Sequence, residues 1–155
     1  RNWVTNDYVF PKTAAPTSFY PMVAAISSDQ QVEQMMARWL TNVSEFCVHP
    51  NCVYGVPSIA RSNPAFHDND YWRGRSWGPM NFLVYLGLQQ YAHLESVRQA
   101  KVSLMKQSQA VFLKEWVGNR RVMENYNSNT GEGCDVGNAN PFYHWGALMA
   151  LIPFR

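Results

Sequence analysis

The feature that most constrains this chain is the pairing of almost wholly apolar segments with amphipathic segments of helical period. Residues 14–26 are nearly all apolar or small, and they end at Ser27 and Ser28. Beyond Ser28, which forms a potential capping box with Gln31, apolar residues recur on one helical face. These are Val32, Met35, Met36, Trp39 and Leu40. The pattern predicts a buried helix followed by a surface helix that covers it.

The same pairing recurs further along the chain. Gly78 and Pro79 precede residues 80–88, which are apolar on nearly every side, and Pro79 suits a first helical turn. Residues 93–116 are amphipathic and predict a covering helix, for which Gly118 offers a stop. A last apolar helix is predicted at residues 143–152. Because no convincing run of alternating apolar and polar residues occurs, the predicted fold class is all-α.

Alternating apolar and amphipathic helices describe an α/α toroid, in which inner helices surround a central funnel. Five helices do not close such a ring, so either an upstream segment supplies more helices or the chain is a smaller irregular bundle. The beginning, Arg1-Asn2-Trp3-Val4, has neither an initiator Met nor a capping signal. We therefore expect a chain entered midway, with residues 1–155 forming part of a larger catalytic unit.

Composition excludes two classes of partner. The 155 residues, of which 46% are hydrophobic, suit one domain with a sizeable core. Thirteen basic and eleven acidic residues give a formal charge of +2, without a Lys/Arg run, so we expect no nucleic-acid partner. No stretch approaches the roughly 20 apolar residues of a membrane helix, so we expect no membrane span.

The cysteines give a weak signal about the cellular compartment. Cys47 and Cys52 are close enough to close a small disulfide loop, which leaves Cys134 alone. His49 lies between them, but no second ligand pair follows, so we expect no metal. Asn42 begins a glycosylation sequon, Asn-Val-Ser. Together these features favour a secreted or lumenal setting.

Two long, polar, Gly-rich segments are poorly explained as connectors. Residues 55–79 combine hydroxyl-gripping side chains with aromatic faces that suit sugar rings. The polar members are Asp68, Asp70, Arg73 and Arg75, and the aromatic members are Tyr71, Trp72 and Trp77. A well-packed loop with an internal Asp–Arg pair is the alternative interpretation.

The second segment, residues 122–146, contains three carboxyl groups: Glu124, Glu132 and Asp135. A glycosidase needs one carboxylic acid to protonate the leaving oxygen and one carboxylate to activate water or attack carbon. Each of the three could equally be an exposed loop acid. Spacing alone does not identify the base.

Three motifs resemble glycoside hydrolase family 63. They are Gly-Val-Pro-Ser-Ile-Ala-Arg-Ser-Asn-Pro-Ala-Phe from Gly55, Asp-Tyr-Trp-Arg-Gly-Arg-Ser-Trp-Gly-Pro-Met-Asn from Asp70, and Glu-Asn-Tyr-Asn from Glu124 with Pro-Phe-Tyr-His-Trp-Gly-Ala-Leu from Pro141. The resemblance covers about residues 10–154. It implies the C-terminal half of an (α/α)6 catalytic barrel, hydrolysis with anomeric inversion, and no cofactor.

The resemblance also assigns roles to single residues. Glu124 matches the general base of the family, which deprotonates water on the face opposite the leaving group. Trp72 and Arg73 match the sugar-gripping turn. The resemblance further implies that five more residues line the same funnel: Tyr71, Trp77, Tyr126, His144 and Trp145.

One catalytic partner has no match in this sequence. The family's general acid is an Asp in a Gly-Leu-Asp-Asp or Gly-Trp-Asp type of motif that lies earlier in the chain, and no segment here matches it. Asp68 and Asp70 stand where the family has no acid. We therefore expect the upstream half of the same enzyme to be a partner, and the isolated chain to hydrolyse nothing.

The resulting hypothesis is an inverting, exo-acting α-glycosidase that cleaves α-glucosidic or α-mannosidic bonds in oligosaccharides or glycosylglycerate. One alternative is a carbohydrate-binding or scaffold module that keeps the aromatic funnel without the chemistry. Another is a helical interaction domain whose aromatic loops pack inward and leave no sugar site.

Overall fold

A computed structural model describes residues 13–154, so the expectation drawn from residues 1–4 lies outside the described part. Helices dominate: α1 (Tyr20–Val23), α2 (Asp29–Met35), α3 (Gly78–Gln90), α4 (Glu95–Asn119) and α5 (Leu148–Leu151). Two short strands, β1 (Ser76–Trp77) and β2 (Asn125–Tyr126), pair with each other. Single turns of 3-10 helix occupy Pro16–Phe19, Pro64–Asp68, His144–Ala147 and Ile152–Phe154.

The predicted surface helix after Ser28 is confirmed. Ser28 and Gln31 form the expected capping box, in which each side chain accepts a hydrogen bond from the other residue's backbone N–H. A π turn at Met36–Leu40 continues α2 and keeps its apolar face in the core. Val32, Met36 and Leu40 are all buried.

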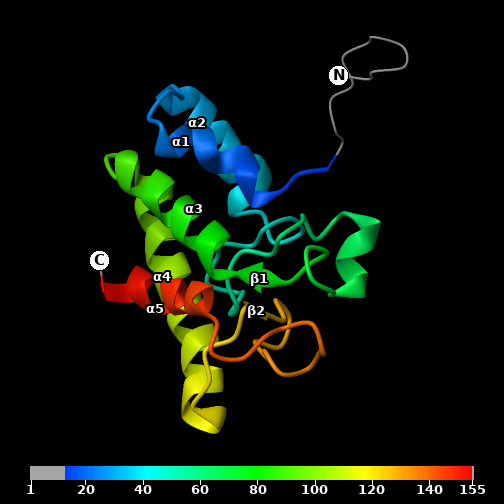
Figure 1. Cartoon of the computed structure of the whole chain (residues 1–155). Helices are drawn as coiled ribbons and strands as arrows, with labels where there is room; N and C mark the ends of the chain where they lie inside the picture. The colour runs from blue at the N-terminus through cyan, green and yellow to red at the C-terminus, as the bar shows by residue number, and fades with distance from the viewer. Residues whose placement is uncertain (1–12, 155) are drawn as a thin grey trace.

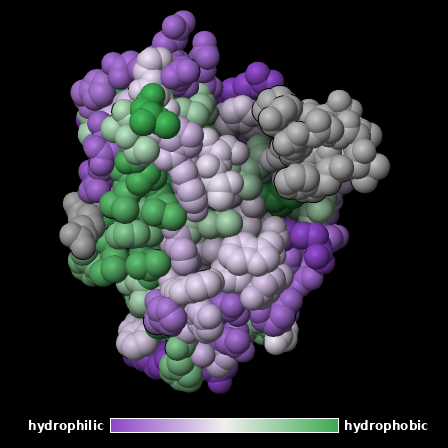
Figure 2. All heavy atoms as spheres, turned by 45° about the horizontal axis from the view of Figure 1, so that its top comes forward, coloured by the Kyte–Doolittle hydropathy of each residue, from purple (hydrophilic) through white to green (hydrophobic). Residues whose placement is uncertain are grey.

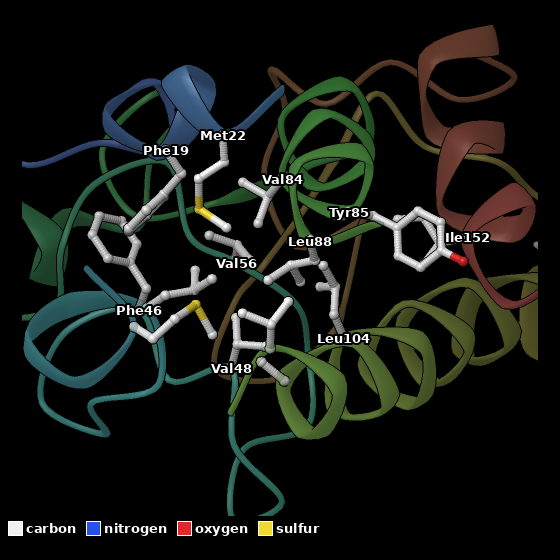
Figure 3. Packing of buried hydrophobic residues seen from close by; sticks show 14 of the residues in the cluster. Phe19, Met22, Phe46, Val48, Val56, Val84, Tyr85, Leu88, Leu104 and Ile152 are labelled. Atoms are coloured by element: carbon white, nitrogen blue, oxygen red, sulfur yellow. The ribbon is translucent and has the colours of Figure 1, made fainter. Parts of the chain in front are cut away.

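Helix α3 is the centre of the molecule, and it packs against α1, α4 and α5 (Figure 1). Its buried positions include Val84, Tyr85 and Leu88, which meet Met22 from α1 and Leu104 from α4 in one cluster (Figure 3). Pro79 lies in the first turn, where a backbone N–H would have no acceptor within the helix, so proline costs no hydrogen bond there. The predicted pair of a buried helix and its 25-residue covering helix is therefore confirmed.

Three predicted boundaries are wrong. Residues 14–26 form only a 3-10 turn and the single turn of α1, and Ile26 is exposed. Pro16 and Pro21 lack the N–H that a continuous helix requires. Gly118 lies inside α4, which instead ends where Arg120 adopts a left-handed conformation, with φ of 53°. The last predicted helix is divided between His144–Ala147, α5 and Ile152–Phe154.

A disulfide joins Cys47 to Cys52, with their Cα atoms 6.0 Å apart. The side-chain amide of Gln107 on α4 contacts three carbonyl oxygens of this loop, those of Cys47, His49 and Cys52, at 3.0 to 3.1 Å. The disulfide closes the loop on itself, and Gln107 anchors the closed loop to α4. Cys134 is a free, exposed thiol.

Within residues 13–154, no helix has the length and apolar character needed to cross a membrane. In Figure 1, α3, α4 and α5 lie on one side of the molecule, and the long loops with β1 and β2 lie on the other. Figure 2 shows apolar side chains gathered in one area of the surface. A half-barrel of (α/α)6 type stays a prediction, whereas a predominantly helical fold with little sheet is what the structure has.

Candidate active site

The two polar segments singled out in the sequence meet at the small antiparallel sheet. Ser76 in β1 is paired with Tyr126 in β2, and Trp77 is paired with Asn125. Glu124 directly precedes β2, so the pairing brings its carboxylate to the aromatic turn that leads into β1. Residues about fifty positions apart therefore form one surface.

Two glycines, Gly78 and Gly146, allow the end of the second segment to pack against this sheet. A Cβ atom on Gly78 would lie 2.0 Å from the carbonyl oxygen of Trp145, and one on Gly146 would lie 2.0 Å from that of Met123. Both approaches are impossible for any residue with a side chain. The backbone around Trp145 can therefore pack directly against the start of α3 and the segment that leads through Glu124 into β2.

Glu124 is the carboxylate at the centre of this arrangement, and only 5% of the residue is exposed. The Tyr71 hydroxyl donates a hydrogen bond to its Oε1 atom at 3.1 Å. The Asn140 backbone N–H approaches Oε2 at 3.4 Å, and the Glu124 N–H donates to the Asn140 carbonyl at 2.9 Å. A buried carboxylate with so few donors is unusual for a loop acid, because a charge removed from water needs hydrogen-bond partners.

The aromatic residues form a stack beside Glu124. Trp72 lies flat on Trp77, with ring centroids 3.7 Å apart and planes inclined by 11°. Tyr71 meets Trp77 edge-on at 4.9 Å, and Trp145 lies 6.3 Å from Trp77. Trp72 is 43% exposed and its neighbour Trp77 is fully buried. Trp72 thus presents an aromatic face to solvent on a rigid support.

Not every predicted funnel residue reaches the surface. Trp77 and Tyr126 are fully buried, so they lie behind the surface and support it. The Tyr126 hydroxyl accepts a hydrogen bond from the Met123 N–H, and burial raises the pKa of Tyr126 to about 12. Trp145 is half-buried, while His144 is exposed and stacks on Tyr143 at 5.3 Å.

Arg73 makes the Asp–Arg contacts that the sequence left open. Its guanidinium binds Asp68 and Asp70, each at 2.7 Å, and about half of its side chain stays exposed. These hydrogen bonds, above all that with Asp68, raise the pKa of Arg73. Asp70 also accepts a hydrogen bond from Asn138 at 2.6 Å. Asp68 and Asp70 therefore hold the turn together while Arg73 keeps an exposed edge.

Sequence reasoning missed the role of Arg75, the fully buried guanidinium behind the site. It binds both carboxylate oxygens of Asp135, at 2.8 and 3.2 Å, and also donates to the Asn125 side chain. Burial alone would raise the pKa of Asp135, but hydrogen bonds from Arg75 and Asn127 outweigh it and lower that pKa. No periodic signal in the sequence separates Arg75 from Arg73, because residues two positions apart in extended chain are expected on the same side.

Two alternatives to this site among the described residues would be a metal site and a separate pocket. No group of three His, Cys, Asp or Glu side chains within residues 13–154 could hold a metal ion. A surface pocket of about 820 Å³ lies between α4 and the disulfide loop, and its lining includes His49, Val53 and Lys106. None of the predicted sugar-binding residues lines this pocket. The motif residues and this pocket are thus in different places.

Comparison with known proteins decides the family. Residues 5–146 match the model of the mannosylglycerate hydrolase MGH1-like glycoside hydrolase domain. The chain belongs to this family. Its relatives place it within glycoside hydrolase family 63, as the three motifs indicated.

Two curated relatives of the chain come from plants. Mannosylglycerate hydrolase MGH1 from Selaginella moellendorffii is 29% identical over 145 residues, which cover 92% of this chain and 25% of the relative. Alpha-glucosidase 2 from Arabidopsis thaliana is 27% identical over 112 residues, 64% of this chain and 14% of the relative. The chain thus spans about a quarter or less of these relatives' lengths.

Solved structures of the family show the same fold. The mannosylglycerate hydrolase of glycoside hydrolase family 63 from Thermus thermophilus, solved in complex with glucose, superposes with a TM-score of 0.63 at 22% identity. The match covers 93% of this chain and 32% of that structure.

Proposed function

We propose that this chain supplies the general-base side of an inverting, exo-acting α-glycosidase site, in which Glu124 is the base. The observation that carries the proposal is the buried Glu124 carboxylate, bound by the Tyr71 hydroxyl beside an exposed Trp72 face. The family to which the chain belongs supports glycoside hydrolysis. Glu132, the nearby alternative, is exposed and binds Thr130, so it lacks this setting.

The proposed reaction follows from what a carboxylate can do in that position. Glu124 takes a proton from a water molecule while the water oxygen attacks the anomeric carbon opposite the leaving oxygen. An acid on the other side protonates the leaving oxygen as the glycosidic bond breaks, and the two carboxyl groups stand about 6.5–9.5 Å apart. The configuration at the anomeric carbon is thereby inverted.

The acid is proposed to lie on another part of the enzyme. Asp68 and Asp70 are bound to Arg73, and Asp135 is bound to the buried Arg75. Each of these carboxylates is therefore already paired with a guanidinium, and hydrogen bonds from Arg75 and Asn127 lower the pKa of Asp135, which disfavours the protonated form that an acid catalyst needs. The chain spans 25% of its mannosylglycerate hydrolase relative, which leaves ample sequence for an upstream acid.

The proposed substrates are α-mannosylglycerate, α-glucosylglycerate or oligosaccharides with a terminal α-glucosyl unit. Relatives bearing the names mannosylglycerate hydrolase and alpha-glucosidase support these classes. The exposed Trp72 face suits the C–H side of one sugar ring, and the exposed edge of Arg73 suits its hydroxyl groups. No proposed step needs a cofactor.

Anomer-resolved NMR on the full-length enzyme tests this function. Each substrate is hydrolysed in a large excess of enzyme, so that product forms faster than its anomers interconvert. We expect the β-anomer of the released sugar to appear first. Early release of the α-anomer would show retention and contradict the mechanism, whereas binding without release of sugar would favour a carbohydrate-binding module.

A further inference from the structure

The Tyr71 side chain contacts Glu124, and its hydrogen bond gives the two carboxylate oxygens different partners. Oε1 accepts the phenolic O–H at 3.1 Å, whereas Oε2 has only the long approach of the Asn140 N–H at 3.4 Å. A hydrogen bond of 3.4 Å is weak. Oε1 is therefore occupied by a side-chain donor, and Oε2 keeps lone pairs for another partner.

The backbone around Tyr71 is held in an uncommon conformation. Tyr71 has φ of 46°, in the left-handed region that bulky residues rarely adopt, and Asn69 has φ of 43°. The Asp70–Arg73 backbone bridge closes the turn, and the Trp77 ring N–H donates to the Tyr71 carbonyl at 3.0 Å. Such conformations persist where the surroundings enforce them, and they cluster at functional sites.

These constraints act together on one atom. Arg73 ties Asp68 to Asp70 on either side of the left-handed Asn69, and the edge-on contact with Trp77 fixes the Tyr71 ring. With both the backbone and the ring held, the hydroxyl has little freedom except to meet Glu124. The turn resembles a sugar-gripping motif, but its Tyr71 hydroxyl donates a hydrogen bond to a protein carboxylate.

We propose that Tyr71 is a positioning residue for Glu124, whose hydroxyl holds Oε1 so that Oε2 is the atom that accepts the proton from water. This inference rests on the proposed function of Glu124. It differs from a role for the Tyr71 hydroxyl in binding sugar, since that hydroxyl already has an acceptor.

The ionisation of Tyr71 agrees with a permanent donor. Burial, together with the hydrogen bond to Glu124 and its negative charge, raises the pKa of Tyr71. The phenol therefore keeps its proton throughout the range in which a glycosidase with an ionised base works.

Tyr71→Phe in the full-length enzyme tests the inference, because it removes the hydroxyl and keeps the ring on Trp77. We expect kcat to fall by about 10- to 100-fold with little change in KM, since a misplaced base slows reaction more than binding. Tyr54→Phe is the matched control: Tyr54 is half-buried, and its hydroxyl has no hydrogen bond within residues 13–154.

The possible results distinguish an error in the positioning role of Tyr71 from an error in the role of Glu124 as the base. A Tyr71→Phe enzyme with normal kcat, alongside an inactive Glu124→Gln enzyme, would overturn the positioning role of Tyr71 and leave the role of Glu124 intact. A raised KM with normal kcat would assign the hydroxyl to sugar binding and also overturn it. An active Glu124→Gln enzyme would instead overturn the proposed function. If kcat returned to normal once it was corrected for the folded fraction measured by circular dichroism, Tyr71 would have only a structural role, and the inference would be overturned.

Discussion

Trp72 and Trp77 lie against each other but differ in exposure to solvent. Trp77 is fully buried and Trp72 lies on it with 43% of its surface exposed. The sequence offers both indoles as stacking faces, and the resemblance assigned Trp72 to the sugar-gripping turn and Trp77 to the lining of the same funnel. Only the pairing of β1 with β2, which buries Trp77, distinguishes the support from the exposed face.

Trp72→Ala should weaken substrate binding because it removes the exposed stacking face. An aromatic contact contributes about 0.5–1.5 kcal/mol beyond buried area, so we expect KM to rise about 2- to 10-fold while kcat changes less. Trp116→Ala is a matched control, since Trp116 is 40% exposed and stacks on Phe112, but lies on α4. Steady-state kinetics measure both; equal KM values for the two variants would remove Trp72 from the site.

Among the elements, those with strong local signals were predictable. The capping box of Ser28 and Gln31 fixed the start of α2, and the apolar run after Pro79 fixed α3. The predicted helix over residues 14–26 was wrong because the prediction relied on apolar character and gave too little weight to the two prolines. Positive φ at Tyr71 and Arg120 carries no sequence signal at a non-glycine residue, so these turns were out of reach.

The convergence at the site was predictable only in part. The resemblance to glycoside hydrolase family 63 indicated that Glu124 and the turn at Tyr71 work together, and the structure brings them into contact. The pairing of Arg75 with Asp135, sixty positions apart, left no periodic trace. Long-range ion pairs of this kind depend on the fold and not on local spacing.

The Arg75–Asp135 pair joins the two segments that form β1 and β2. Asp135→Asn should leave the buried guanidinium without its anion and lower the free energy of unfolding by about 1.5–3 kcal/mol. Because the pKa of Asp135 is lowered in the folded state, its stabilisation is present above about pH 4 and is lost as pH falls further. The difference between wild type and variant should therefore shrink between pH 5 and pH 3.

Urea unfolding of the full-length enzyme at several pH values measures this effect. Asp68→Asn is the control, because its pair with Arg73 is about half exposed and should contribute less than about 1 kcal/mol. Equal losses for the two variants, or a difference that does not vary with pH, would show that the Arg75–Asp135 pair has no special role.

Several large apolar side chains of the molecule are exposed at its surface. Leu151 and Phe154 near the end of the described chain are 43% and 84% exposed, and Val102 and Leu113 on α4 are 51% and 41% exposed. With Met105 and Phe112, they line or adjoin a pocket of about 330 Å³. Apolar patches of this kind mark contact surfaces, and another part of the catalytic domain is the partner we propose.

Residues 1–155 expressed alone should therefore self-associate and show no turnover, whereas co-expression with the upstream half should give a soluble, active complex. Light scattering and hydrolysis of α-glucosylglycerate measure the two properties. Turnover by the fragment alone would mean that a carboxyl group within it, such as Asp70 or Asp135, protonates the leaving oxygen.

The most direct test of the central claim is azide rescue of Glu124→Ala in the full-length enzyme, with Glu132→Gln as the control from the same loop. Loss of the base should lower kcat by about 10²–10⁴-fold, and Glu132→Gln should leave it near normal. Azide, which needs no base, should restore turnover in the space left by the carboxylate and yield the β-glycosyl azide from an α-substrate. A Glu124→Ala enzyme with near-normal kcat, or an azide product that keeps the α configuration, would contradict the assignment of Glu124 as the base of an inverting glycosidase.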